Sequence, residues 1–454
     1  MAKQEVVRSV FMITCVLLLI PFLSPCVSSM NVAKDETSQE QVTEPTTSDS
    51  LQRALHKKYY SQLYEYWKNQ MWREALEPGR KMCIDAIEPG KKAIEIDPKY
   101  KSAYYYLADC YVRLAELDSA QRVYERGLEV DSENKYFHRG LAYVLLAKGL
   151  EEEAISEYEI VVEQFPEESS YNLTLAKLYI NQENDEGAIR EFERASETDL
   201  KKREAWIEAR DKILDEKGGE DPQVIQYNQQ IEQIDGQIRD ELSTLEILYK
   251  RNDMVVNLVD VYLKYLRLNP EDTQAKLNLG KQYYDIGEHE KTEEVLTELV
   301  EMDPGNVEAY FYLGRCCLSM GKSREAIDAY KKVIELEPDN IKGYAELASA
   351  YNEIGQPDAA ERNVKKAINL DPDYGYARVV YGEIYEKRAT PHIDKDGRVK
   401  LEWARVFEKA VEQFAKAKKD PEWKAYAEGK IEYLSQFLPT DEQKFFEEGK
   451  KPNK

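Results

Sequence analysis

The sequence predicts an all-α solenoid of helix-turn-helix pairs, because a unit of 34 residues recurs along the chain and its apolar residues have helical spacing. The stretch "AYFYLGRCCLSMGKSREAIDAYKKVIELEPDN", residues 309–340, is followed by "GYAELASAYNEIGQPDAAERNVKKAINLDPDY", residues 343–374. In each stretch large apolar residues lie three and four positions apart, which places them on one face of a helix. Gly321 marks a turn after the first helix and Pro338 ends the second.

The repeat keeps its register over most of the chain. The units begin at Lys101, Lys135, Ser169, Arg203, Arg239, Thr273, Val307, Ile341 and Gly375. The close-packing site of the first helix holds the small residues Ala108, Ala142, Ala176, Gly280, Gly314, Ala348 and Gly382. The second helix carries alanine at Ala120, Ala154, Ala188, Ala326 and Ala360, with Leu258 and Thr292 as departures. The closing proline recurs at Pro98, Pro166, Pro270, Pro304, Pro338 and Pro372, with Ser132 and Leu200 as exceptions.

One unit departs from the regular length. The spacing from Arg203 to Arg239 is 36, and the turn "DEKGGEDPQ" is longer than its counterparts, although Trp206 keeps the first-helix pattern. From residue 224 to residue 249 the apolar spacing continues at three and four with no proline stop. We expect one long helix here, or two nearly collinear helices, joining two solenoid blocks. Gly236 is the one candidate break.

The ends of the array are irregular, as terminal repeats commonly are. At residues 74–95 "EALEPGRKMCI" is echoed by "DAIEPGKKAIE", and Pro78 and Pro89 predict a kinked or segmented helix. Near the other end, residues 389–402 predict a long loop between the two helices of the last unit. The second helix then resumes with Ala410, Phe414 and Ala417.

These units resemble the tetratricopeptide repeat family, whose 34-residue pattern places Trp, Leu-Gly, Tyr, Ala, Phe and Pro at fixed offsets. The resemblance covers residues 101–386, with degenerate flanking repeats. It implies a right-handed superhelix whose concave face is lined by the first helices. An array is also required energetically, because one helix pair buries too little apolar surface to offset the entropy of ordering its chain.

In the family, the second, fifth, ninth, twelfth and thirteenth residues of each unit point into the concave groove. Here several of these places are aromatic or basic, which suits a peptide with carboxylates and apolar anchors. The candidate groove residues are Tyr105, Arg139, Tyr143, Lys177, Lys281, Tyr284, Phe311 and Arg315. The alternative is that these Lys and Arg residues are solvated partners of nearby Glu. The carboxylate clamp by which some family members dock chaperones does not map onto these units.

The formal net charge of −23 restricts the classes of partner. Nucleic-acid binding needs clustered Lys and Arg, and no such basic block occurs in the sequence. Attraction to a bare anionic membrane surface is disfavoured for the same reason. We therefore expect a protein or peptide partner, with an acidic peptide suiting the basic groove. The oligomeric state is not determined by the sequence.

The first thirty residues have the layout of an export signal. Lys3 and Arg8 precede an apolar run, and small residues follow it up to Ser29. Three alternatives remain: soluble export after cleavage, a lipid anchor on Cys26, and an uncleaved membrane anchor. "LSPC" resembles a lipoprotein box but departs from it at Pro25. We expect an exported protein of the periplasm or cell envelope, with membrane attachment only through this segment.

The sequence shows no cofactor motif and no metal-ligand spacing. Cys316 and Cys317 are expected to be buried small hydrophobes, and a disulfide between Cys83 and Cys110 is left open. The histidines His56, His138, His289 and His392 are scattered and lack a catalytic context. Intrinsic enzymatic activity would require a cleft around His392, Asp394 and Asp396, although a plain turn is the favoured interpretation there.

The expected function is that of a non-enzymatic scaffold that binds protein partners in the cell envelope through the concave groove. The alternative is an accessory subunit that recruits substrate to an envelope enzyme, such as a polysaccharide or glycan export or assembly system. The expected organisation is a signal segment (1–29), a disordered polar tether (30–50), an N-terminal repeat block (51–217), a connecting helix region (218–250), a C-terminal repeat block (251–386), an inserted loop (387–402), terminal helices (403–438) and a tail (439–454).

Overall fold

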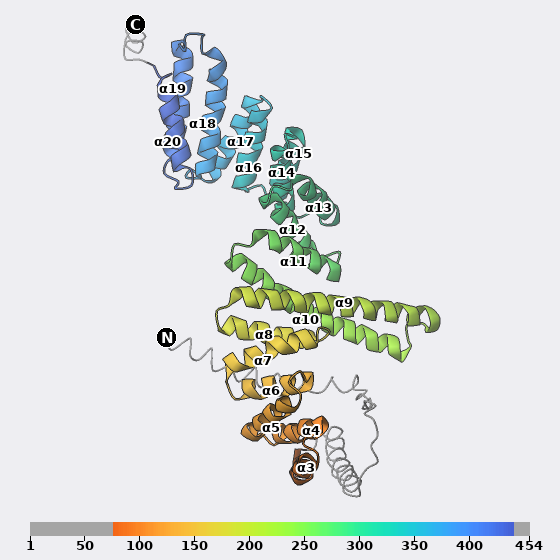
Figure 1. Ribbon diagram of the computed structural model, residues 1–454. Helices are drawn as coiled ribbons and strands as arrows, with labels where there is room; N and C mark the ends of the chain where they lie inside the picture. The colour runs from red at the N-terminus through yellow and green to blue at the C-terminus, as the bar shows by residue number, and fades with distance from the viewer. Residues whose placement is uncertain (1–75, 440–454) are drawn as a thin grey trace, which may run out of the picture. The chain divides into compact units, whose positions relative to one another are not determined.

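The computed structural model describes residues 76–439, and in this range the chain is built from α-helices (Figure 1). The predicted all-α solenoid of helix pairs is confirmed. The chain divides into two compact units, Met1–Glu241 and Leu242–Lys454, and the division falls inside one long helix. Each unit is described by itself. The signal segment, Cys26 and the polar tether lie outside the described residues, so the expectations made for them stay predictions.

The helices of unit 1 alternate between the first and second helix of successive repeats. They are α3 (Leu76–Ile96), α4 (Lys101–Arg113), α5 (Leu117–Val130), α6 (Lys135–Ala147), α7 (Glu151–Gln164), α8 (Ser169–Asn181) and α9 (Asp185–Lys217), followed by α10 (Pro222–Arg251), which crosses the division. The three first helices α4, α6 and α8 begin at the residues where the repeat units were predicted to begin. Their register is therefore confirmed.

Unit 2 repeats the same alternation with the same helix lengths. Its helices are α11 (Val255–Leu268), α12 (Thr273–Asp285), α13 (His289–Met302), α14 (Val307–Ser319), α15 (Ser323–Leu336), α16 (Ile341–Glu353), α17 (Pro357–Leu370), α18 (Gly375–Ala389), α19 (Leu401–Ala417) and α20 (Lys424–Ser435), with a 3-10 turn at Thr390–His392. The first helices α12, α14, α16 and α18 again begin at the predicted residues. Each of them packs on the next first helix, so together they form one face, called here the first-helix face.

The proline-containing start of the array is one helix. A segmented helix was one of the expectations for residues 74–95, and that alternative is wrong, because α3 runs without interruption from Leu76 to Ile96 with Pro89 inside it. Pro78 lies in the first turn, where the backbone N–H has no partner within the helix in any case. Only Pro89 removes an internal hydrogen bond, and the burial of Ala86 and Ala93 on either side of it anchors the helix.

The middle of the chain contains two helices that are each about twice the usual length. The predicted long helix is confirmed as α10, which passes through Gly236 without a break. The repeat register predicts one helix that ends near residue 200 and another that begins at Arg203. This prediction is wrong, because α9 runs for 33 residues through that point. Leu200 stands where most units have their closing proline, so nothing there removes a backbone donor or forces an extended conformation. In α9 the second helix of one unit therefore continues into the first helix of the next.

The end of α9 and the start of α10 form an antiparallel hairpin within unit 1 (Figure 1). Arg203 pairs with Asp235, Arg210 Nη1 donates to Asn228 Oδ1 at 3.4 Å, and Lys217 Nζ donates to Gln223 Oε1 at 3.2 Å. Gly218 closes the turn with a positive φ of 87°, a conformation that favours glycine. The long turn predicted at "DEKGGEDPQ" thus becomes the tip of a helical hairpin.

Close helix packing in unit 2 depends on the small residues predicted at the first-helix site. A Cβ atom on Gly314 would lie 2.7 Å from Tyr330 Cε1, and one on Gly382 would lie 2.7 Å from Phe414 Cζ. Tyr330 and Phe414 are both fully buried. The aromatic ring of each second helix therefore occupies the space that the missing side chain of the first helix leaves.

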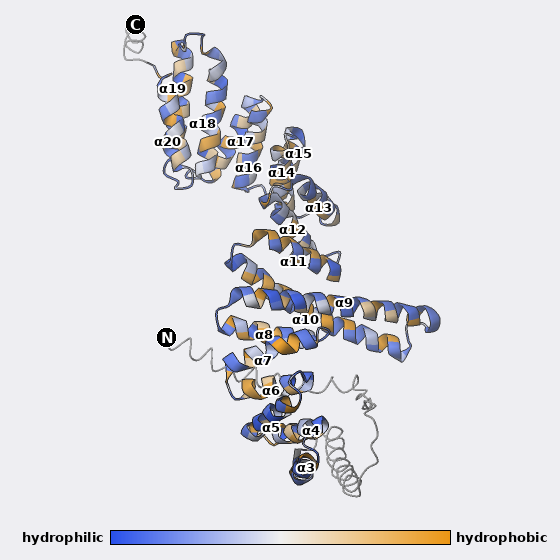
Figure 2. Ribbon diagram, in the orientation of Figure 1, coloured by the Kyte–Doolittle hydropathy of each residue, from blue (hydrophilic) through white to orange (hydrophobic). Residues whose placement is uncertain are grey.

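Each helix carries hydrophilic and hydrophobic residues together, as an amphipathic repeat requires (Figure 2). Among residues 76–439, no helix combines the length and the apolar character needed to cross a membrane. Beyond α18, an antiparallel bridge joins Ile393 to Val399, and α19 and α20 close the array over a core that includes Phe407, Phe414 and Leu434.

Candidate peptide-binding site

Two basic candidates and two tyrosines come together on the first-helix face of unit 2. Lys281 and Tyr284 lie on α12, and Tyr312 and Arg315 lie on α14. The Arg315 guanidinium lies 4.8 Å from the ring centre of Tyr284 and 6.0 Å from that of Tyr312. The two rings meet edge to face at 5.8 Å. This geometry is that of a cation held against aromatic faces.

Arg315 is half-buried, and among residues 76–439 its side chain has no carboxylate or carbonyl partner. An arginine carries five N–H donors, so its hydrogen-bonding capacity at this position is left for water or a ligand. The buried hydroxyl of Tyr330 on α15 also has no hydrogen-bond partner there. The Tyr330 ring lies close to this site, because its centre is 6.0 Å from that of Phe311 on α14.

Lys281 differs from Arg315 although both occupy the ninth place of their units. Lys281 Nζ lies 2.7 Å from Glu308 Oε1 and 5.3 Å from the ring centre of Tyr312. The residue equivalent to Glu308 one repeat later is Lys342, so the sequence supplies Arg315 with no corresponding acid. The alternative of ordinary pairing with Glu therefore holds for Lys281. Phe311, the remaining candidate on α14, packs edge to face on Tyr312 and Tyr330.

Unit 1 has a second aromatic and basic cluster. Arg139 Nη2 donates to the Tyr105 hydroxyl at 2.8 Å, and the guanidinium lies 5.4 Å from the ring centre of Tyr136 and 5.8 Å from that of Phe165. Lys135 lies 4.8 Å from the Phe165 ring centre. Tyr105, Tyr136 and Phe165 form a row of edge-to-face contacts. Arg139 is thus already engaged by the fold.

The other two candidates in unit 1 lie apart from that cluster. Tyr143 on α6 is half-buried, and burial followed by the charge of Asp109 raises its pKa. Lys177 on α8 is exposed, and its charge acts on Glu241 of α10. No hydrogen bond, ion pair or ring contact joins either residue to Arg139 within the described part of the chain.

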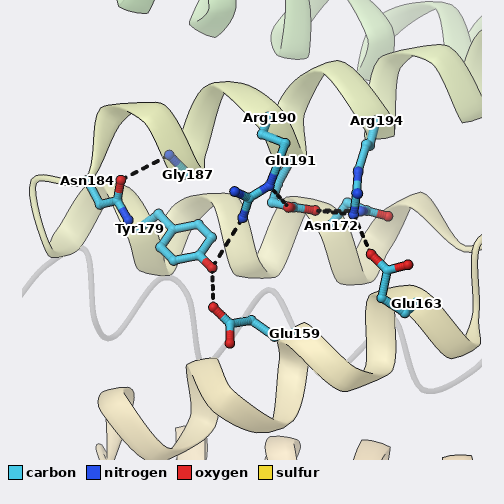
Figure 3. Close-up of polar contacts among 9 residues, drawn as sticks. All are labelled: Glu159, Glu163, Asn172, Tyr179, Asn184, Gly187, Arg190, Glu191 and Arg194. Carbon is cyan, nitrogen blue, oxygen red and sulfur yellow. Dashed lines mark hydrogen bonds and ion pairs between the residues drawn. The ribbon is translucent and has the colours of Figure 1, made fainter.

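A larger charged network in unit 1 shows what a fully paired arrangement looks like (Figure 3). Glu191 on α9 is 1% exposed; it accepts from Asn172 Nδ2 at 2.8 Å and pairs with Arg190 Nε at 2.8 Å. Arg194 reaches Glu163 of α7 at 2.8 Å, and the Tyr179 hydroxyl donates to Glu159. Arg194 has a carboxylate partner from α7, whereas Arg190 pairs with Glu191 of its own helix and also donates to the Tyr179 hydroxyl of α8. These contacts tie α7, α8 and α9 together and leave both arginines with carboxylate partners.

Two buried carboxyl groups meet where α9 packs against α10. Asp199 is 2% exposed and Glu241 is 3% exposed. Ser169 Oγ donates to Asp199 Oδ1 at 2.6 Å, and Gln237 Nε2 donates to both carboxyl groups. Burial and the charge of Asp199 raise the pKa of Glu241 to about 8, and burial raises the pKa of Asp199. The raised pKa favours the protonated form of Glu241, which lessens the repulsion between the two buried carboxyl groups.

We expect Glu241→Gln to stabilise the protein at pH 8.5 and to change it little at pH 4.5. The pKa of Glu241 is raised in the folded state, so the folded chain binds a proton that the unfolded chain has lost, and stability falls as pH rises from about 4.5 to about 8. Glutamine keeps the donor and removes the titration. The gain at pH 8.5 should be on the order of 2 kcal/mol, measured by urea denaturation followed by circular dichroism. Exposed Glu232→Gln on the same helix is the control; a pH dependence unchanged by Glu241→Gln would contradict this account.

The remaining sequence candidates take structural roles. Cys83 and Cys110 are buried thiols of one core cluster, within hydrogen-bonding reach of each other, and Cys316 and Cys317 are buried as expected. In the loop after α18, Asp394 Oδ1 accepts from the backbone N–H groups of residues 396 and 398, which confirms the predicted turn. His392 stacks on Trp403 with ring centres 3.5 Å apart. Within residues 76–439 no group of three metal-ligating side chains converges.

Sequence reasoning missed several residues of the two clusters. Tyr312 occupies the sixth place of its unit, which was not among the groove places considered, and Tyr330 belongs to a second helix. Tyr136 occupies a second place, which the family pattern includes. Reading the sixth place as well would have found Tyr312. The orientation of the Tyr330 hydroxyl has no signal in the sequence.

Comparison with known proteins locates the same repeats. Three family models described as tetratricopeptide repeat match residues 85–143, 307–340 and 329–362. A crystal structure of the MamA protein is 27% identical over 39% of this chain and 88% of that chain, with a TM-score of 0.32. MamA from Desulfovibrio magneticus is 16% identical, covering 39% of this chain and 92% of that one, with a TM-score of 0.34.

YrrB, described as a TPR protein with an unusual peptide-binding site, is 16% identical over 63% of this chain and 95% of its own, with a TM-score of 0.25. No curated relative matches the chain. The family matches fall in both units: residues 85–143 run from within α3 to within α6, residues 307–340 begin with α14 and cover the pair α14 and α15, and residues 329–362 run from within α15 to within α17. Residues 85–143 and 307–362 therefore match models of the tetratricopeptide repeat, and the resemblance of the chain to that family is confirmed.

Proposed function

We propose that the chain is a protein-interaction scaffold that binds a carboxylate-bearing peptide at the first-helix face of unit 2. The proposal depends on one observation: the half-buried Arg315 guanidinium lies against the rings of Tyr284 and Tyr312 and has no carboxylate partner among the described residues. Partial burial of an unpaired cation costs solvation, and a ligand carboxylate would offset that cost with two parallel hydrogen bonds. The site is thus arranged for an acceptor that the fold itself does not supply.

The surroundings of Arg315 favour a peptide over a free anion. Tyr284, Tyr312 and Phe311 are half-buried and provide aromatic surface beside the guanidinium. Aromatic and arginine side chains are the residues that most often carry binding energy at protein interfaces. An acidic residue with an apolar or aromatic neighbour would contact both parts of the site. The Arg139 cluster of unit 1 is a weaker candidate, because Arg139 already donates to Tyr105.

A peptide selection tests this function directly. A random peptide display library is selected against the purified chain and, in parallel, against Arg315→Gln, after circular dichroism shows equal helicity. We expect peptides enriched in Asp or Glu next to an apolar residue, and we expect this enrichment to be lost with the variant. Enrichment that is identical for both proteins would place peptide binding elsewhere, and the absence of enriched peptides would count against a peptide scaffold at this face.

We also propose that the protein is exported and works in the cell envelope. The support is the sequence of residues 1–29, where basic residues, an apolar run and small residues follow in the order of a secretory signal. Mass spectrometry of the protein from its native cells distinguishes the alternatives. A new N-terminus near residue 30 indicates soluble export, a lipid-sized mass on Cys26 that Cys26→Ser removes indicates an anchor, and an intact Met1 terminus in the soluble fraction would contradict export.

The second candidate function is an accessory role in which the chain recruits substrate to a separate envelope enzyme. The tyrosines of the two clusters support this second function, because aromatic faces also bind sugar rings. Protection of Tyr284 and Tyr312 from chemical modification separates the two functions. Protection by oligosaccharide and not by acidic peptide would favour substrate recruitment.

A further inference from the structure

A cavity of about 390 Å³ lies over α4 in unit 1, and its volume is within the range of cavities that bind small ligands. α3 and α5 both pack on α4, and all three helices line the cavity. From α4 come Tyr104, Leu107 and Tyr111, at the fourth, seventh and eleventh places of their unit. At 3.6 residues per turn, these places lie on the side of a helix opposite to the groove places. The cavity is therefore separate from the first-helix face.

The inner part of the cavity is apolar. Leu107 of α4 is 2% exposed, Ile94 of α3 is 6% exposed, and Val123 of α5 is half-buried. The Tyr104 hydroxyl donates to the carbonyl oxygen of Pro98 at 2.9 Å, so each of these two polar groups already has a partner. The cavity thus offers an apolar lining that three helices share.

Two cations line the same cavity, one from each of the helices that flank α4. The exposed Arg126 of α5 lies 5.8 Å from the ring centre of Tyr104, and among residues 76–439 it has no carboxylate partner. Lys91 of α3 pairs with Glu88 at 3.0 Å, and both side chains are exposed, so this pair contributes little and is readily exchanged for a ligand. Glu95 is the acid of the lining, and it pairs with a lysine that does not line the cavity. The charges left for a ligand are therefore positive.

The same places of the repeat over α16 provide a comparison within the chain. They hold Lys331 and Lys366 where the cavity over α4 has its two cations, and Asn363 where that cavity has Val123. The two positive charges are kept there and the apolar wall is lost. Lys366→Gln is for this reason a matched control for Arg126→Gln.

Positive charge beside an apolar lining suits a ligand in which an anion is attached directly to an apolar group. The C-terminal residue of a protein has this form, because its carboxylate and its side chain are bonded to the same carbon atom. The side chain enters the cavity while the carboxylate accepts charge-assisted hydrogen bonds from the two cations. A fatty acid also joins the two groups, but its long chain extends far from the carboxylate, whereas the apolar lining here comes from only a few residues.

We propose that the cavity over α4 binds the C-terminal residue of a partner protein that ends in an apolar side chain. Arg126 and Lys91 hold the terminal carboxylate, and Ile94, Leu107 and Val123 contact the side chain. The site lies on other helices than Arg315 and does not depend on the peptide recognition proposed there. The chain would then have a second place of attachment for a partner, recognised by a chain end.

The test uses three hexapeptides with fluorescein on the N-terminus: a Leu acid (GSGSGL with a free C-terminus), a Leu amide (GSGSGL amidated) and a Ser acid (GSGSGS with a free C-terminus). Fluorescence anisotropy with the full chain at pH 7.5 measures their affinities. We expect the Leu acid to bind at least about tenfold more tightly than either of the other two, because each of them lacks one of the two groups that the cavity recognises.

Arg126→Gln should weaken binding of the Leu acid about tenfold and leave that of the Leu amide unchanged. Because Arg126 is exposed, its loss should not alter the fold, and circular dichroism verifies equal helicity. Val123→Asn copies the wall over α16 and should reduce the affinity for the Leu acid to that for the Ser acid. The controls Lys366→Gln and Arg315→Gln should each change the affinity for the Leu acid by less than about twofold.

Several results would overturn the proposal. Equal affinities for the Leu acid and the Leu amide, or no binding of either, would contradict recognition of a terminal carboxylate. Equal losses from Arg126→Gln and Lys366→Gln would indicate general attraction to positive charge. A loss from Arg315→Gln and not from Arg126→Gln would place the chain end at the first-helix face. Displacement of the Leu acid by laurate at lower concentration than by unlabelled Leu acid would assign the cavity to an acyl chain.

Discussion

Replacing Arg315 by glutamine is expected to weaken binding of an acidic peptide from the display selection by at least about 30-fold, or about 2 kcal/mol. The guanidinium supplies the donors that face the ligand, and its half-buried place between Tyr284 and Tyr312 makes each hydrogen bond count for more than it would in open solvent. Calorimetry measures the affinity, and circular dichroism verifies that helicity is unchanged. Arg315→Lys should be intermediate, because it keeps the charge and loses the planar stacking surface.

The matched control is Lys281→Gln, which removes a cation from the same place of the preceding unit. Lys281 already pairs with Glu308 on the surface, so its loss should change the affinity less than about fivefold. Equal losses from Arg315→Gln and Lys281→Gln would indicate a general electrostatic attraction and not a built carboxylate site. A high-salt titration gives a second readout, because exposed charges are screened more strongly than half-buried ones.

The regular part of this fold follows from short-range signals. The first helices begin at Lys101, Thr273, Val307 and Ile341 as the 34-residue register predicts, since each start is fixed by a turn and a closing proline a few residues earlier. The fused helix α9 was missed although Leu200 was recognised as lacking that proline. The absence of a stop signal permits a helix to continue but does not require it, and the packing of α9 against α8 and α10 decides between the two outcomes.

The candidate site could be predicted only in part, because its chemistry depends on pairs of residues from different units. Placing Arg315 and Lys281 on the same face required only the repeat register. Whether each cation has a carboxylate partner depends on the second residue of the following unit. That residue is Glu308 for Lys281, which forms an ion pair, and Lys342 for Arg315, which cannot form one. The role assigned to Tyr330 depends on how one buried ring lies between two helices, and no local sequence pattern determines that.

Gly314→Ala should destabilise unit 2 by about 1–3 kcal/mol, although alanine is the better helix former. Its Cβ would lie 2.7 Å from Tyr330 Cε1 and 2.8 Å from Tyr330 Cζ, and the ring is fully buried, so either the ring or α14 must move. Gly236→Ala in α10 is the matched control, because no atom lies within 4 Å of the Cβ that it adds. That variant should gain about 0.5–1 kcal/mol from helix propensity alone. Urea denaturation followed by circular dichroism compares the two.

A double variant shows whether the clash with Tyr330 is the cause. Tyr330→Leu alone loses buried aromatic surface and should cost about 2–4 kcal/mol. In the double variant, Tyr330→Leu removes the ring atoms that the new methyl group of Gly314→Ala would meet. The destabilisation of the double variant should therefore be smaller than the sum of the two single destabilisations by at least about 1 kcal/mol. If the two destabilisations simply add, the clash between the new methyl group and the Tyr330 ring is not the cause of the loss in Gly314→Ala. Because the same ring packs edge to face on Phe311, four residues before Arg315 on α14, Gly314→Ala should also weaken carboxylate binding, whereas Gly236→Ala should leave it unchanged.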